Sequence, residues 1–191
     1  MTVLVVATGN PGKLREMQQY LDGSGWELQL KPAELDVEET GDTFAANAAL
    51  KASQTALATG EWAIADDSGL AVVALGGAPG IYSARYGSDD ADRISRVLRE
   101  LDGAGDRAAA FVCAVAVARP DGGIVVAVEG RCEGTILEAP RGDGGFGYDP
   151  IFWVPSLERS FAELTMEEKR RVSHRGNAFA QLLPQLAALD S

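Results

Sequence analysis

Histidine and cysteine are scarce in this sequence, which contains one histidine and two cysteines among its 191 residues. Cys113 and Cys132 stand in apolar or mixed surroundings and lack the paired spacing of a zinc site. We therefore interpret both as reduced core residues. Their pattern argues against a disulfide-stabilised scaffold and against a cysteine-rich metal centre.

Long apolar runs and excess positive charge are also missing. The longest apolar run, residues 108–118, has about half the length that a bilayer span requires, and the N-terminal residues lack the basic flank of a signal peptide. The formal net charge of −11 argues against nucleic acid or an anionic membrane surface as a partner. We expect a cytoplasmic protein. The negative net charge does not exclude a small phosphorylated ligand, because such a ligand needs only a local basic group.

The composition is that of a globular protein, with 46% hydrophobic and 24% charged residues. Its length indicates a single domain over residues 1–191. Helices and strands alternate early, and two extended runs joined at residues 119–122 favour an antiparallel pair later. We therefore predict a mixed α/β sheet flanked by helices. The expected strands lie at 3–7, 27–30, 62–65, 109–118, 123–131 and 151–154, with a further strand at 135–137. The expected helices lie at 11–21, 43–58 and 89–101, from 165 onward and from 173 onward.

The first candidate site is the stretch T-G-N-P-G-K from Thr8 to Lys13, between an apolar strand and a predicted helix. Backbone N–H groups and the helix dipole favour an anion at such a helix start. Gly9 and Gly12 let a ligand approach the backbone, and Lys13 adds a charge for a phosphate oxygen. The spacing differs from the P-loop pattern, and a tight turn with a solvated lysine explains this stretch alone equally well.

A second candidate is the alanine-rich segment from Glu38 to Ala52. Asn47 and Lys51 are four residues apart and therefore share one face of a helix with small side chains. Such a polar pair suggests close approach to a charged group. From this segment alone, a solvent-facing stripe is the favoured interpretation.

Two adjacent carboxylates, Asp66 and Asp67 in A-D-D-S-G-L, follow a short apolar run. A carboxylate at the end of a strand faces the crevice where α/β proteins bind ligands. With Glu38 or Glu39 nearby, it could hold Mg²⁺, which prefers a few carboxylates together with water and phosphate oxygens. The alternative is a cap on the turn at Ser68. Both interpretations can hold at once, with one aspartate for each role.

The glycine-rich segment from Pro140 to Pro150 predicts a loop. Phe146 and Tyr148 within it would offer aromatic faces to a nucleobase. A hairpin with these rings in the core is the alternative.

The last candidate segment, residues 167–176, contains His174, the single histidine, followed by Arg175. A lone histidine is more often structural than a ligand. Arginine at a helix start opposes the dipole, so a ligand acceptor or a carboxylate would explain it. Lys169, in the preceding helix, could point the same way.

Together and in order, these segments resemble the inosine triphosphate pyrophosphatase family. The resemblance covers nearly the whole chain and depends on the motifs T-G-N-P-G-K, E-E-T-G-D-T-F, A-D-D-S-G-L, G-A-P-G-I-Y-S-A-R-Y, G-G-F-G-Y-D-P-I-F, E-L-T-M-E-E-K and S-H-R-G. It implies Mg²⁺-dependent hydrolysis of the α–β phosphoanhydride of ITP, dITP and XTP, which removes deaminated purines from the nucleotide pool. It also implies an elongated sheet with two lobes, an active-site cleft between them, and a homodimer.

The resemblance assigns roles to individual residues. Glu38 and Asp67 would bind the metal, and Asp67 would also take the proton from the attacking water. Asp66 would then steady the turn at Ser68. The remaining residues would contact substrate, from the triphosphate to the base: Thr8, Gly9, Asn10, Pro11, Gly12, Lys13, Lys51, Ser68, Phe146, Gly147, Tyr148, Asp149, Lys169, His174 and Arg175.

Two alternatives stay open at this point. One is a related nucleotide pyrophosphatase with another base preference, such as modified pyrimidines. The other is a non-catalytic nucleotide-binding module. The carboxylates predicted beside the scissile phosphate argue against this second alternative.

Overall fold

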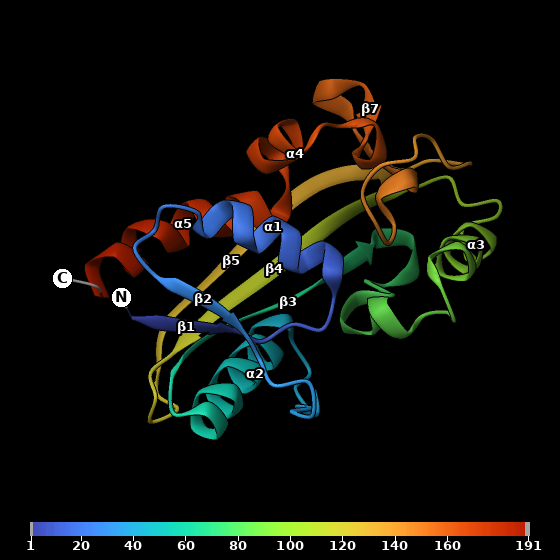
Figure 1. Cartoon of the computed structure of the whole chain (residues 1–191). Coiled ribbons are helices and arrows are strands. Elements are labelled where there is room, and N and C mark those ends of the chain that lie inside the picture. Colours follow the sequence, from blue (N-terminus) through green and yellow to red (C-terminus); the bar gives the residue numbers. More distant parts are fainter. Residues whose placement is uncertain (1, 190–191) are drawn as a thin grey trace. The chain divides into compact units, whose positions relative to one another are not determined.

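The computed structural model describes residues 2–189, and its strands form one sheet in the order β2-β1-β3-β4-β5-β6-β7 (Figure 1). β1 pairs in parallel with β2 and β3, whereas β6 pairs antiparallel with β5 and β7. The sheet is therefore mixed, as predicted. The strands are β1 (Val3–Val6), β2 (Glu27–Leu30), β3 (Trp62–Val72), β4 (Ala108–Ala118), β5 (Ile124–Ile136), β6 (Phe152–Val154) and β7 (Arg159–Ser160); the helices are α1 (Pro11–Leu21), α2 (Phe44–Thr59), α3 (Asp90–Glu100), α4 (Met166–Val172) and α5 (His174–Leu189).

Two compact units divide the chain. The first unit contains residues 1–67, 113–130 and 175–191, and the second unit contains residues 68–112 and 131–174. The boundary falls within β3, β4 and β5, so these strands contribute to both units. The prediction of a single domain and that of a cleft between two lobes both stay predictions.

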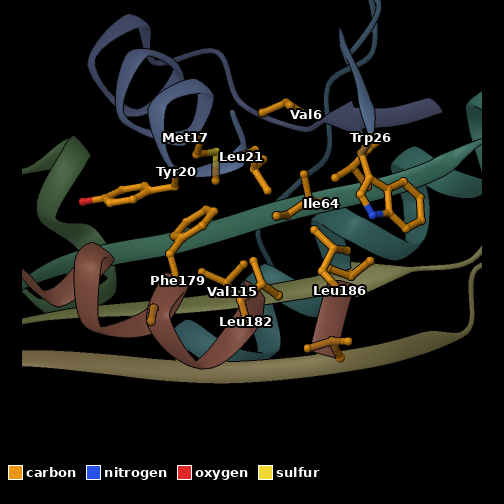
Figure 2. Close-up of a cluster of buried hydrophobic side chains, with 14 of the residues drawn as sticks. Val6, Met17, Tyr20, Leu21, Trp26, Ile64, Val115, Phe179, Leu182 and Leu186 are labelled. Carbon is orange, nitrogen blue, oxygen red and sulfur yellow. The ribbon is translucent and has the colours of Figure 1, made fainter. Parts of the chain in front are cut away.

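A large apolar cluster in the first unit lies where α1 and α5 cover one face of the strands (Figure 2). Tyr20 of α1 stacks on Phe179 of α5 with ring centroids 4.6 Å apart, and Ile64 of β3 lies in the same cluster. Burial of such side chains stabilises a fold by about 1.5–3 kcal/mol each. This packing holds both helices against the strands.

The opposite face of the same strands carries α2 (Figure 1). Its Ala48, Ala52 and Ala56 are fully buried against Ala63 and Ala65 of β3. Successive strand residues point to opposite faces. Odd-numbered β3 residues from 63 to 67 therefore lie on the α2 side, and even-numbered ones lie on the side of α1 and α5.

The second unit has its own aromatic core. Phe111 packs on Phe152 and Phe161 with ring centroids 4.5 and 5.4 Å away, and Ile94 and Val97 of α3 complete the cluster. Within the described residues, no helix combines the length and apolar character that a membrane crossing requires.

Side chains cap the starts of several helices. The side chain of Asn10 accepts hydrogen bonds from the N–H groups of Gly12 and Lys13, and Thr43 caps α2 by accepting one from the N–H of Ala46. Thr165 and Glu168 form a capping box at the start of α4.

Two local predictions are wrong. β3 continues through Asp66 and Asp67 to Val72, so Asp66 does not steady a turn at Ser68. Residues 135 and 136 belong to β5 rather than to a separate strand.

Candidate active site

Asp66 and Asp67 occupy adjacent positions of β3 and therefore point to opposite faces of the sheet. Both are buried, with exposed fractions of 1% and 5%. An unpaired charge at such a position is costly, so each carboxylate needs its own partners. The structure supplies these from different helices.

Asp66 is paired with cations on the side of α1 and α5. Its Oδ2 accepts a hydrogen bond from Nη2 of Arg175 at 3.0 Å and lies 3.2 Å from Nζ of Lys13. The other terminal nitrogen of Arg175 bonds Glu16. Although burial alone would raise the pKa of Asp66, Lys13 and Arg175 outweigh it and hold that pKa well below its usual range. Asp66 is thus a fixed negative charge that holds Lys13 and Arg175 in place.

Asp67 faces α2, where Lys51 lies between two carboxylates. Nζ of Lys51 is 3.6 Å from Oδ1 of Asp67 and donates a hydrogen bond of 2.7 Å to Glu39. The pKa of Asp67 is raised, because burial raises it by more than the positive charges of Lys51 and Lys13 lower it. Neighbouring carboxyls with pKa values pushed apart are typical of acid–base chemistry. Asp67 is the better suited of the two to accept a proton.

Lys51 stays charged in this setting. Burial would lower its pKa, but Asp66, Asp67 and Glu39 together outweigh burial and raise it. A cation between acidic groups balances their repulsion.

Glu38, the predicted metal ligand, is exposed, whereas Glu39 is the acid that lies beside Lys51. Asn47 of α2 holds the segment that carries Glu39, because its side-chain oxygen accepts a hydrogen bond of 2.8 Å from the N–H of Gly41. A Cβ at Gly41 would come within 2.7 Å of that oxygen, so the close approach requires glycine. Asn47 is therefore a structural part of the site rather than a solvent-facing residue.

One oxygen of Asp67 suits a divalent cation. Its Oδ2 is buried and has no hydrogen-bond partner among the described residues. Asp67 and Glu39 together offer the oxygen ligands that Mg²⁺ prefers, completed by water and phosphate. Within the described part of the chain, no larger cluster of three acidic, histidine or cysteine ligands forms. The residues present fit a cation that is shared with the substrate.

The strand-to-helix turn from Thr8 to Lys13 is open to a ligand. No atom of residues 2–189 outside the immediate chain neighbours lies within 4 Å of the position that a Cβ on Gly9 would take. Pro11 begins α1, whose N-terminus favours negative charge, and Lys13 points toward Asp66. The turn combines an accessible backbone with a cation.

In the second unit, Lys169 and Asp149 form a buried ion pair with a separation of 2.7 Å. The same Asp149 oxygen accepts a hydrogen bond from the N–H of Phe146. Lys169 also lies 4.7 Å from the centroid of the half-buried Phe146 ring. These contacts fix the loop around Phe146.

Tyr148 and His174 lie in the core of the second unit. The hydroxyl of Tyr148 donates a hydrogen bond of 2.7 Å to the carbonyl of Ser83, and His174 stacks on Phe111 with centroids 4.6 Å apart. Of the two loop aromatics, Phe146 is thus the more accessible. Phe146 therefore fits the predicted aromatic surface, whereas Tyr148 fits the alternative, in which the ring lies in the core.

The predicted residues fall into one group in each unit. The first unit brings together Lys13, Lys51, Asp67 and Arg175 with the turn that also contains Thr8, Gly9, Asn10, Pro11 and Gly12, and the second unit contains Ser68, Phe146, Gly147, Tyr148, Asp149, Lys169 and His174. Sequence reasoning missed the roles of Glu16 and Asn47. Glu16 precedes the buried Tyr20 by four residues, and this helical spacing could have placed it on the buried face.

Fold and site define an α/β protein with an open strand-to-helix turn, lysines paired with acidic side chains, and a carboxylate pair suited to a divalent cation. The chain belongs to the Ham1 family, whose profile matches residues 4–185. It is 65% identical over 189 residues to a dITP/XTP pyrophosphatase of Nostoc sp., covering 99% of this chain and 96% of the relative. A second dITP/XTP pyrophosphatase, from Synechocystis sp., is 59% identical and covers 99% of this chain and 97% of the relative.

Solved structures agree with this assignment. A HAM1 protein from Coxiella burnetii has a TM-score of 0.90 and 43% identity, covering 98% of this chain and all of that one (100%). A nucleoside-triphosphatase, or dITP/XTP pyrophosphatase, from Mycobacterium abscessus has a TM-score of 0.76 and 45% identity, covering 97% of this chain and 100% of that one.

Proposed function

We propose that this protein hydrolyses dITP, XTP and ITP to the nucleoside monophosphate and pyrophosphate. Water attacks the α-phosphorus, the bond to the bridging α–β oxygen breaks, and pyrophosphate leaves. The observation that carries this proposal is the buried Asp67, which has Lys51 beside it and one oxygen without a hydrogen-bond partner among the described residues. The chain also closely resembles proteins named for this reaction.

The triphosphate would bind to the first unit. The turn from Thr8 to Lys13 lies at the start of α1, where the helix dipole favours an anion, and Lys13 and Lys51 neutralise phosphate oxygens. Arg175 and Asp66 hold the Lys13 side chain in position. Such prepositioned charges stabilise the charge that develops during phosphoryl transfer.

Asp67 would act as the general base. Burial raises the pKa of its carboxyl, so it binds a proton more readily than an exposed aspartate does. Asp67 and Glu39, rather than Glu38, would hold Mg²⁺. When bound, such a cation polarises phosphate oxygens and makes water a stronger nucleophile.

The base would bind to residues of the second unit. Phe146 offers a ring for stacking, and the buried pair of Lys169 and Asp149 fixes the loop that carries it. His174 stays a predicted donor for the 6-oxo group of inosine and xanthine. Arg175 stays a second predicted donor, although its terminal nitrogens bond Asp66 and Glu16 in the first unit. Adenine presents an amino group at the 6-position, and an unpaired buried donor can discriminate by about 10⁴-fold or more.

A substrate panel tests this function. One enzyme preparation is assayed for pyrophosphate release from ITP, dITP, XTP, GTP, ATP and dUTP, with and without Mg²⁺. We expect fast release from the first three only, and loss of release with EDTA, restored by Mg²⁺. Equal rates with dUTP would indicate another base preference, and no release from any nucleotide would favour a binding module.

We also propose a homodimer in the cytoplasm, as the family resemblance implies. The free, buried state of Cys113 and Cys132 is compatible with a reducing compartment. Light scattering during size-exclusion chromatography would test the dimer.

A further inference from the structure

The loop that carries Phe146 receives a hydrogen bond from a helix far away in the sequence. The N–H of Gly147 donates to Oδ2 of Asp90 at 2.8 Å, although the two residues are 57 positions apart. Asp90 is an exposed residue at the start of α3, a helix to which no predicted role is assigned. The other oxygen of Asp90 accepts a hydrogen bond of 2.7 Å from Arg93, which fixes the carboxylate in this orientation.

Gly147 needs such an external contact. Its φ of 59° lies in the left-handed region, and no described residue other than its chain neighbours has an atom within 4 Å of the position that a Cβ would take. A glycine without packed neighbours can leave such a conformation easily. The hydrogen bond to Asp90 therefore holds the peptide between Phe146 and Tyr148.

The flanking residues are held by other groups. Asp149 accepts the N–H of Phe146, and the hydroxyl of Tyr148 donates to the carbonyl of Ser83. Phe146, Gly147 and Tyr148 thus bond three different partners, Asp149, Asp90 and the carbonyl of Ser83. Of these three partners, Asp90 is the exposed side chain.

We propose that Asp90 is a positioning residue that orients Phe146 for stacking on the purine base. This inference rests on the proposed function, because it assigns the loop to base binding. Asp90 does not touch the reacting atoms and acts through the backbone of Gly147. Since stacking stabilises substrate and transition state alike, Asp90 should influence KM more than kcat.

The test compares Asp90→Ala, Asp90→Asn and, as a matched charge control, Asp102→Ala, which removes an exposed aspartate beyond the other end of α3. We expect Asp90→Ala to raise KM for ITP by about three- to tenfold, as loss of a partly exposed hydrogen bond would. Its kcat should stay within about twofold. Asp90→Asn keeps an oxygen acceptor, so its KM should lie close to that of the wild type. Asp102→Ala should have the same KM as the wild type.

Amide hydrogen exchange of Gly147, followed by NMR without nucleotide, gives a readout that needs no turnover. Exchange should be faster in Asp90→Ala than in the wild type and in Asp102→Ala. Unchanged exchange or an unchanged KM would overturn the inference, as would a loss of kcat at constant KM. A wild type inactive toward ITP would instead overturn the proposed function, so the two failures are distinguishable.

Discussion

Neighbouring acids with different environments decide the chemistry at the scale of single residues. Glu38 is exposed and Glu39 contacts Lys51, although the two are adjacent in the sequence. Asp66 is held ionised by Lys13 and Arg175, whereas burial raises the pKa of Asp67. The sequence places the acids near each other but does not reveal which cation each one meets, because the cations come from separate helices.

Substitution of the adjacent glutamates tests the metal assignment. Glu39→Gln should lower kcat/KM for ITP by about 100-fold or more, because several kcal/mol of charge stabilisation are lost with a metal ligand. Glu38→Gln is the matched control and should stay within about twofold of the wild type. Steady-state kinetics with pyrophosphate detection measures both. The reverse result would restore Glu38 as the ligand.

Removal of the general base should separate activity from stability. Asp67→Asn should lower kcat by about 10²- to 10⁴-fold, the usual contribution of general base catalysis. Because burial already disfavours the charge of Asp67, the neutral amide should fold at a similar melting temperature. Kinetics and thermal unfolding on the same sample would check this, and wild-type turnover would exclude Asp67 as the base.

At the scale of elements, local signals are predictable and long-range pairings are not. The caps at Asn10, Thr43 and Thr165 act within a few residues, so their sequence pattern predicts the helix starts correctly. The extent of β3 is mispredicted because two adjacent aspartates indicate a turn. Their partners Arg175 and Lys51 come from α5 and α2, and these make a strand through buried carboxylates possible.

Gly134 provides a prediction about strand packing. A Cβ there would lie 2.5 Å from the carbonyl oxygen of Trp153 and 2.6 Å from the ring of Phe152. Gly134→Ala should therefore lower the free energy of unfolding by about 1–3 kcal/mol, as overpacking does. Gly105→Ala is the control, because nothing surrounds that position, and it should change little. Urea denaturation measures both, and equal midpoints would contradict the close packing of β5 on β6.

At the scale of the whole molecule, each unit contains one buried thiol. Cys113 belongs to the first unit and Cys132 to the second. Burial raises the pKa of Cys113 to about 12 and that of Cys132 to about 11. Both thiols are thus protonated and protected in the folded protein at neutral pH.

Thiol labelling therefore reports on each unit separately. At pH 8, an aromatic disulfide reagent should label neither cysteine in the folded protein and both after unfolding in urea. Single variants, Cys113→Ala and Cys132→Ala, assign the signals. Two coincident transitions would indicate that the units unfold together, and rapid labelling without urea would contradict the burial of the thiols.

The same pKa shifts predict how stability depends on pH. When folding raises the pKa of a thiol, the thiol contributes to the free energy of unfolding. This contribution is fully present below the unfolded pKa of about 8.5 and is lost as the pH rises toward the folded pKa. The urea midpoint should therefore fall between pH 8 and pH 10. The double variant with both cysteines replaced by alanine should show a smaller decrease, and an equal decrease would exclude the thiols as its cause.

The chain passes between its two units four times, after Asp67, Val112, Gly130 and His174. Neither unit is a continuous stretch of sequence, so no single cut or gene fusion can transplant the Phe146 loop with its supporting core onto another scaffold. New substrate preferences in such a chain must evolve in place, by exchange of individual side chains rather than by recombination of modules.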